Sequence, residues 1–340
     1  MKNTSTIIPV YQPDCQVNSW KKLLKEAVST PASLLEAVGL AEHPIRLQLA
    51  ELSEFKTRVP QPYIDKMTKG NPDDPLLRQV LSHQNETITF SGYSKNPLKE
   101  EHNAIPGLLH KYKGRVLLIL ASACAVNCRY CFRRHFPYQD SLASGAQLEN
   151  ALSYIAKSPS ISEVILSGGD PLMVSDSRLF EVIAKLEDIP HLKRLRFHTR
   201  LPVVIPQRIT QALVDRLNHS RLKISLVLHI NHANEIDSLL SEYLALFASS
   251  KITLLNQSVL LKGVNDSLDS LQELSEKLFE NKVLPYYLHL LDKVIGAAHF
   301  EVNTNVAVKL IEELQKRLPG YLVPKLAREE PGRASKTVIA

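Results

Sequence analysis

Three of the four cysteines in this 340-residue chain lie within eight residues of one another. They are Cys124, Cys128 and Cys131, which gives the spacing C-x3-C-x2-C. Four cysteines are too few for a disulfide scaffold in a chain of this length, and thiolates this close together can hold a metal. Iron–sulfur clusters normally take four cysteine ligands, so three leave one iron open to a substrate or cosubstrate. The spacing therefore favours an open iron–sulfur cluster.

Two other interpretations of the cysteine group stay open. Structural zinc needs a fourth ligand, and the nearest candidate is His135, four residues after Cys131. A group of thiols without a metal is the second alternative, although a loop after a strand is an unusual place for it. Cys15 lies far from the other three, and nothing near it in the sequence completes a metal motif.

A second candidate feature is the run Ser167, Gly168, Gly169 and Asp170, which is followed by proline. Two adjacent glycines allow a backbone to approach a ligand closely. Taken alone, Gly-Gly-Asp-Pro is the signature of a turn. Because this run follows a short apolar segment downstream of the cysteines, it becomes a candidate ligand-binding turn.

These residues must be positioned by a scaffold, and the sequence repeats a strand and a helix about every 30 residues. The expected strands are 115–120, 164–166, 195–199, 223–229, 253–261 and 283–291. The expected helices between and after them are 175–186, 207–217, 233–247, 267–279 and 304–318. Units of about 30 residues are typical of strand–helix crossovers, so six of them predict an α/β fold with a parallel sheet that curls into a barrel or partial barrel. The chemistry of such barrels lies at the C-terminal ends of the strands, which is where the cysteines fall.

The rest of the chain divides into two further parts. Residues 1–105 are expected to form a helical N-terminal extension, with helices over 18–28 and 30–38 that each begin at a capping residue. The barrel is expected over 106–320, and 321–340 forms a C-terminal segment. These boundaries follow the change from proline-rich joints to the regular repeat.

The composition is that of an ordinary soluble protein. There are 41 Lys and Arg residues against 35 Asp and Glu, and 44% of residues are hydrophobic. The basic residues are scattered, so we expect no nucleic-acid partner. The uncharged run 116–126 is far shorter than the roughly 20 residues of a membrane span, and the N-terminus lacks a secretory signal. A cytoplasmic protein without a membrane partner is expected.

The cysteine loop, with Tyr130 before its last cysteine, resembles the signature of radical S-adenosylmethionine (SAM) enzymes. The six expected strand–helix units agree with the partial (βα)6 barrel of that family. Longer segments are similar to the lysine 2,3-aminomutases over most of residues 55–340; they are HKYKGRVLLIL, CRYCFRRHF, TRLPVVIPQRIT, NQSVLLKGVND and PYYLHLLDKVIGAAHF. The chain most resembles the short bacterial branch that makes (R)-β-lysine for the modification of elongation factor P.

The resemblance implies an isomerase that converts (S)-α-lysine to (R)-β-lysine with three cofactors. The implied cofactors are a [4Fe-4S] cluster, SAM and pyridoxal 5′-phosphate (PLP). In the implied reaction, a 5′-deoxyadenosyl radical removes a hydrogen from C3 of lysine and the 2-amino group migrates to C3. Enzymes of this kind leave the difficult chemistry to their cofactors, while the protein positions them and excludes water.

The resemblance also assigns cofactor-binding residues. The three cysteines would hold the cluster. The same cofactor pocket would be lined by the turn Ser167, Gly168, Gly169 and Asp170, together with Gln257 and His229. His229 is as readily explained as a strand-end histidine paired within the protein. Lys336 would be the lysine that binds PLP, and Lys111 and Arg115 would meet its phosphate. In this chain Gly332 is followed by Arg333, Ala334 and Ser335, where the family commonly has a run of glycines.

The resemblance assigns substrate contacts by charge. Arg133 would bind the lysine carboxylate, with Arg134 beside it, because a planar guanidinium suits bidentate carboxylate binding. Asp292 and Glu329 would bind the ε-ammonium, although the long enzymes have aspartate where this chain has Glu329. The rival functions are an aminomutase for glutamate or arginine, which would lack this anionic pair, and a non-catalytic metal-binding protein, which would not need Lys336.

The implied partners are L-lysine, a reductant such as flavodoxin or ferredoxin, and a functional link to elongation factor P and its lysyl ligase. Because related enzymes are oligomers, a homo-oligomer is also expected, with the helical N-terminus as a candidate subunit interface.

Overall fold

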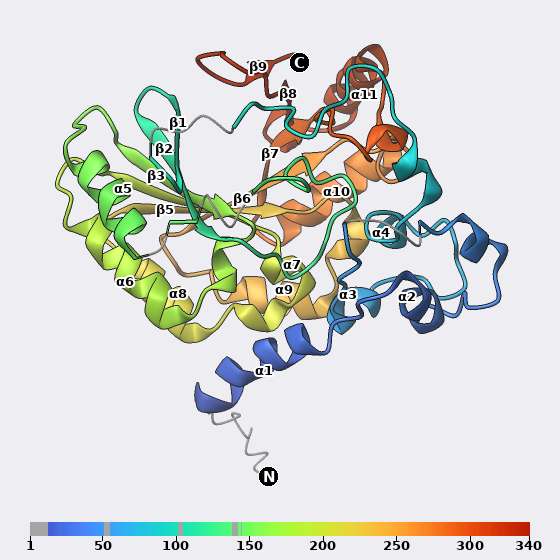
Figure 1. The fold of residues 1–340 in the computed structure, drawn as a ribbon, viewed down its shortest axis with the longest axis horizontal. Coiled ribbons are helices and arrows are strands. Elements are labelled where there is room, and N and C mark those ends of the chain that lie inside the picture. Colours follow the sequence, from blue (N-terminus) through green and yellow to red (C-terminus); the bar gives the residue numbers. More distant parts are fainter. Residues whose placement is uncertain (1–12, 51–54, 101–104, 138–141, 144) are drawn as a thin grey trace, which may run out of the picture.

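The computed structural model describes residues 13–50, 55–100, 105–137, 142–143 and 145–340 (Figure 1). Cys15 lies in the first described helix, but its side chain is outside the described part. No helix in these ranges is both long and apolar enough to span a membrane.

A single curved sheet positions the site, and its strands follow one another in chain order from β1 to β9 (Figure 1). The strands are β1 (Leu108–Tyr112), β2 (Arg115–Ala121), β3 (Glu163–Gly168), β4 (Arg194–Thr199), β5 (Lys223–His229), β6 (Thr253–Val259), β7 (Leu284–His289), β8 (Lys325–Arg328) and β9 (Thr337–Val338). Strands β2 to β8 pair in parallel, whereas β1 and β9 add antiparallel strands at the two edges. Strands β2 to β7 are the six expected strands, so the α/β partial-barrel prediction is confirmed.

Helices connect the parallel strands and cover the outer side of the sheet (Figure 1). They are α5 (Ala146–Ala156), α6 (Asp176–Glu187), α8 (Gln211–Asn218), α9 (Ser238–Ala245), α10 (Leu268–Glu280) and α11 (Thr304–Arg317). The hydroxyl groups of Ser175, Thr210 and Ser267 accept hydrogen bonds from the first turns of α6, α8 and α10, which explains where these helices begin. The expected helix 207–217 starts later, at Gln211, because a short 3-10 turn, η4 (Pro206–Arg208), precedes it.

Alternate residues of each strand face opposite sides of the sheet, and the two sides differ in character. The outer side packs against the helices through residues such as Leu118, Leu166, Phe197 and Leu226, all fully buried in the main core. The inner side, the barrel lumen, carries more polar residues at the alternate positions; among them are Ser167, His198, His229, Gln257, Tyr287 and His289. Polar groups that converge on a barrel lumen are typical of a ligand-binding site.

The N-terminal part is helical, as expected, and includes α1 (Pro13–Lys25), α2 (Pro31–Ala37), α3 (Gln61–Ile64) and α4 (Pro75–Arg78). The short helix α7 (Leu201–Val204), which follows β4, lies next to α3. The first helix ends earlier than the expected 18–28, at Lys25, and Thr30 caps the second. Trp20, Leu34 and Tyr63 belong to the same hydrophobic core as the barrel strands. The N-terminal part is therefore packed onto the barrel, and the boundary at residue 105 stays a prediction.

Candidate functional site

The cysteine loop begins directly after β2, and the glycine pair at the end of β3 holds it in place. Gly169 N donates to the Ala121 carbonyl at 2.7 Å, and Asp170 N donates to the Ala123 carbonyl at 3.0 Å. A Cβ on Gly169 would lie 2.4 Å from the Ala123 oxygen, and a Cβ on Gly168 would lie 2.5 Å from the Ala121 oxygen. The glycines were expected to admit a ligand, and the close approach that the structure shows is to the chain's own backbone.

Replacing Gly169 with alanine should test this contact. The added methyl group would overlap main-chain atoms of Ala123, which cannot rotate away, so we expect a loss of roughly 1–3 kcal/mol in the free energy of unfolding and a lower iron content after reconstitution. Denaturant unfolding and iron analysis measure the two effects. Gly320→Ala is the control, because a Cβ there meets nothing within 4 Å. Equal stability and iron content in the two variants would contradict the role given to Gly169.

The side chain of Asp170 ties the ends of β3 and β4 together. Its carboxylate accepts the Thr199 hydroxyl at 2.7 Å and the backbone N–H groups of Leu172, Arg200 and Leu201 at 2.7–3.0 Å. Burial nevertheless raises its pKa above the ordinary value. Because the chain's own donors engage both oxygens, direct contact between Asp170 and a cofactor stays a prediction.

The three thiols of the loop are close enough to affect one another's ionisation. Burial, followed by the charges of the neighbouring thiols, raises the pKa of Cys124 well above its usual range and that of Cys131 to about 11. In the part of the chain that the structure describes, no group of three His, Cys, Asp or Glu side chains is arranged to hold a metal ion. Three soft thiol donors on one loop fit an iron–sulfur cluster, whose cysteines bind different irons and need not meet at one point.

His135, the fourth ligand that zinc would need, points elsewhere. Its Nε2 lies 3.4 Å from the carbonyl oxygen of Ile295. The neighbouring Arg134 donates to Glu86 at 2.7 Å and to the Gly296 carbonyl at 3.0 Å. These side chains therefore fix the cysteine loop to the chain around it.

A second group of side chains gathers where the β8–β9 hairpin returns to the barrel. The hairpin pairs Arg328 with Thr337, so Glu329 and Lys336 come next to each other across it. Lys336 Nζ lies 2.7 Å from Glu329 Oε2 and 5.7 Å from the centre of the Tyr287 ring, which belongs to β7. The hairpin thus carries a lysine from near the C-terminus to the barrel lumen.

Asp292, three residues after β7, belongs to the same group. Burial, together with the charges of Glu329 and Glu100, raises its pKa to about 7, while Lys336 opposes the shift. Glu329 has a second cation nearby, because Lys111 Nζ lies 3.9 Å from Glu329 Oε1. The structure therefore brings together four residues that the sequence had assigned to substrate or PLP.

Arg133 makes a bidentate ion pair with Glu100, an acid that the sequence analysis did not identify. Its Nε and Nη2 contact the Glu100 carboxylate at 2.8 and 3.2 Å, and its Nη1 lies 3.3 Å from the Ser167 hydroxyl. Burial would raise the pKa of Glu100, but Arg133 and Lys111 outweigh it and hold that pKa at about 2. Lys111 Nζ reaches the same carboxylate at 2.9 Å. A buried carboxylate thus lies between the two cations that were expected to bind substrate carboxylate and PLP phosphate.

Two lumen histidines were also missed by the sequence analysis. His198 Nε2 is buried and has no hydrogen-bond partner among the described residues. Burial lowers the pKa of His198 and of His289 well below the ordinary value, and the charge of Lys336 lowers both further. Both imidazoles are therefore neutral. An unsatisfied buried nitrogen near Lys336 fits a lumen built to hold a polar ligand.

The remaining predicted residues are Gln257 on β6, His229 on β5 and Arg115 on β2. Gln257 pairs in register with His229 on one side and Tyr287 on the other. His229 Nε2 is 3.2 Å from the Tyr130 hydroxyl, so this histidine already has a partner within the protein. The guanidinium of Arg115 stacks on the Tyr112 ring at 4.4 Å. Cofactor contacts of these residues stay predictions.

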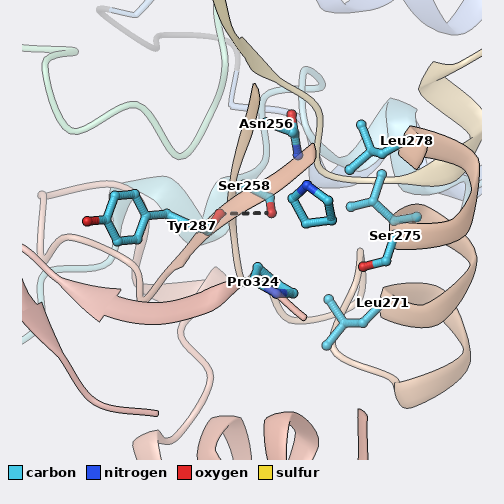
Figure 2. Close-up of a pocket in the computed structure, with 9 residues that line it drawn as sticks. Asn256, Ser258, Leu271, Ser275, Leu278, Tyr287 and Pro324 are labelled. Atoms are coloured by element: carbon cyan, nitrogen blue, oxygen red, sulfur yellow. Dashed lines mark hydrogen bonds between the residues drawn. The ribbon is translucent and has the colours of Figure 1, made fainter. Parts of the chain in front are cut away.

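A small cavity outside the barrel is separate from this site (Figure 2). It lies between α10 and the outer side of β6 and β7, and Asn256 and Ser258 line it on either side of the lumen-facing Gln257. Figure 2 shows the Tyr287 ring pointing away from it. We therefore assign it no part in the chemistry.

Comparisons with known proteins cover nearly the whole chain. Residues 118–239 match the radical SAM superfamily. The L-lysine 2,3-aminomutase of Haemophilus influenzae is 51% identical over 323 residues, or 95% of this chain and 96% of that protein. The Escherichia coli L-lysine 2,3-aminomutase is 51% identical over 321 residues, or 94% of each. The Clostridium subterminale L-lysine 2,3-aminomutase is 34% identical over 96% of this chain and 79% of that protein. The likeness therefore extends well beyond the cysteine loop.

Proposed function

This chain belongs to the lysine 2,3-aminomutase family of radical SAM enzymes, and on that premise we propose that it converts (S)-α-lysine to (R)-β-lysine for attachment to elongation factor P. It is an isomerase, and its cofactors are a [4Fe-4S] cluster, SAM and PLP. When bound, these three groups supply the radical chemistry that moves an amino group between neighbouring carbons. The observation that carries the lysine proposal is the group of charged side chains, Lys336, Glu329 and Asp292, at the barrel lumen.

Lys336 is proposed to bind PLP through its amine. Glu329 Oε2, 2.7 Å from Lys336 Nζ, would hold this amine in place, and the amine is the group to which PLP would be bound. Lys111 and Arg115 are proposed to bind the phosphate, since they stand on the two strands of the β1–β2 hairpin. The neutral lumen histidines add no charge that would compete with these cations.

Substrate recognition is proposed to depend on opposite charges at two ends of the site. Asp292 and Glu329 present carboxylates to the distal ammonium of lysine, and Arg133 presents a guanidinium to its carboxylate. Arg133 is paired with Glu100, so a substrate carboxylate must share the guanidinium or displace Glu100. Glutamate has no cation for the anionic pair, which favours lysine over it.

The raised pKa of Asp292 predicts how lysine binding depends on pH. The neutral acid prevails below about pH 7, whereas a substrate ammonium requires the carboxylate. The KM for lysine should therefore fall by about tenfold per pH unit as pH rises towards 7 and then level off. The same group binds its proton more tightly in the folded than in the unfolded chain, so its contribution to folding stability should decrease as pH rises from near 4 to about 7.

Steady-state kinetics between pH 5.5 and 8.5 on the wild type and Asp292→Asn measure this dependence. The variant should have a high KM that no longer changes with pH across about 7. A variant that keeps the wild-type pH profile would show that another group titrates there.

Anaerobic reconstitution tests the function as a whole. The protein is supplied with iron, sulfide, PLP, SAM and a reductant, and the products from lysine, glutamate and arginine are separated by chiral chromatography. (R)-β-lysine from lysine supports the proposal, whereas a β-amino acid from glutamate or arginine alone would replace it with that of a related aminomutase. Transfer of the product to elongation factor P by its lysyl ligase then tests the finer role.

Three further expectations belong to the same proposal. We propose a flavodoxin or ferredoxin as the reductant, a cytoplasmic location, and a homo-oligomer in which the N-terminal helices take part. Neither nucleic acid nor membrane enters the proposed reaction. Reduction of the cluster by purified flavodoxin and light scattering of the intact protein test the reductant and the oligomer.

A further inference from the structure

One buried guanidinium reaches a sulfur of the cysteine loop from the end of β4, two strands away from β2 in the sheet. Arg200, which directly follows β4, is 7% exposed, and its Nη1 lies 2.8 Å from Cys128 Sγ. The same guanidinium contacts four buried polar groups, the hydroxyls of Tyr63 and Tyr130, Gln79 Oε1 and Glu235 Oε2. The contact to sulfur is therefore one arm of a fixed network.

The network holds Arg200 from several segments of the chain. Tyr63 and Gln79 come from the N-terminal part, and Glu235 comes from the turn after β5. Glu235 is fully buried, and the backbone N–H of Asn231 donates to it at 2.9 Å. The backbone N–H of Arg200 itself donates to Asp170. Because both the backbone and the guanidinium of Arg200 are hydrogen-bonded, the guanidinium has little freedom to move away from the sulfur.

The sulfurs of Cys131 and Cys128 have different hydrogen-bond donors. The sulfur of Cys131 accepts the neutral backbone N–H of Arg133, whereas that of Cys128 faces a charged guanidinium. Hydrogen bonds to cluster sulfurs and nearby charge help to set the reduction potential of iron–sulfur clusters. A buried cation favours the reduced cluster, because reduction adds one negative charge in a region of low dielectric constant.

We propose that Arg200 is a positioning residue that holds the Cys128 sulfur and raises the reduction potential of the cluster. The proposal rests on Cys128 being a cluster ligand, as proposed above. Glu235 opposes the effect, since its carboxylate at 2.9 Å offsets part of the guanidinium charge. The proposal also accounts for Tyr130 in the motif, because its hydroxyl contacts Arg200 and accepts from Asn231 Nδ2 at 2.7 Å.

The test is a redox titration of the reconstituted protein, followed by the electron paramagnetic resonance signal of the reduced cluster. In Arg200→Gln we expect either a more negative midpoint potential at full iron content or loss of iron from a folded chain. In Glu235→Gln we expect a shift to less negative potential, because the cation loses its counter-charge. Opposite signs in two variants of one network are not expected of a merely structural role.

Arg208→Gln is the matched control. Arg208 is also a buried arginine, but its Nε donates to the Leu172 carbonyl at 2.7 Å and its ion pair is with Asp176, so its loss should cost stability without moving the potential. A wild-type potential in Arg200→Gln at full iron content would overturn the proposal. If that variant does not fold, Glu235→Gln decides, and an unchanged potential there overturns it. A wild type that takes up no cluster would instead count against the proposed function.

Discussion

Cys124→Ala should leave a folded protein without a functional cluster. The thiol is one of three proposed donors, and alanine offers no replacement, so we expect loss of the broad visible absorbance of the cluster and a fall in activity of more than about 100-fold. We expect at least this loss because removing a side chain that only hydrogen-bonds to a metal ligand typically costs about 10–100-fold in metal affinity or activity. Iron analysis, visible spectroscopy and the lysine assay measure the three effects.

The control for this variant is Cys15→Ala, which removes a thiol outside the predicted motif. It should retain full iron content and activity. PLP binding should persist in Cys124→Ala, because Lys336 approaches from the other side of the barrel on the β8–β9 hairpin. A Cys124→Ala protein with a complete cluster and wild-type activity would remove Cys124 from the set of ligands.

The strand–helix repeat was predictable because buried parallel strands have a simple signature. Apolar runs with amphipathic helices between them predicted β2 to β7, and the observed β5 has the expected bounds, Lys223–His229. Strands β1, β8 and β9 were not predicted. They are two to five residues long, and β1 and β9 are joined to the sheet by hairpins, so pairing with a neighbour defines them more than their own composition does.

Resemblance identified residues that can carry chemistry, but it did not identify the side chains that hold them. Glu100, His198 and Arg200 were missed for a common reason. Glu100 lies in the charged run KEEH, and nothing local distinguishes a buried acid from an exposed one. Arg200 is paired with Glu235, 35 residues away, and such contacts exist only once the barrel has closed around the loop.

The N-terminal part illustrates the same limit. From sequence it was a helical extension and a candidate subunit interface. In the structure Glu86 binds Arg129 and Arg134 of the cysteine loop, and Tyr63 and Gln79 bind Arg200. These contacts make the extension part of the scaffold of the cysteine loop, which no pattern in its own residues indicates.

Lys336→Ala should separate the PLP role from the cluster role. We expect the variant to keep the cluster spectrum, to lose the absorbance of lysine-bound PLP, and to lose lysine aminomutase activity by more than about 1,000-fold, equivalent to roughly 4 kcal/mol of transition-state stabilisation. Borohydride reduction of the PLP-loaded wild type, followed by peptide mass spectrometry, should place the label on Lys336.

The group of charged side chains around Lys336 gives this variant a second signature. Lys336 lowers the pKa of Asp292 and also pairs with Glu329, so its removal leaves two neighbouring carboxylates with one cation fewer. The pKa of Asp292 should then rise above its value of about 7, while Lys325→Ala, which removes an exposed lysine on β8, should leave it unchanged. Carboxyl chemical shifts in a nuclear magnetic resonance titration measure both. An Asp292 pKa that is the same in wild type and Lys336→Ala would mean that the hairpin does not bring the amine to the substrate end of the site, and retained PLP absorbance would reassign the cofactor lysine.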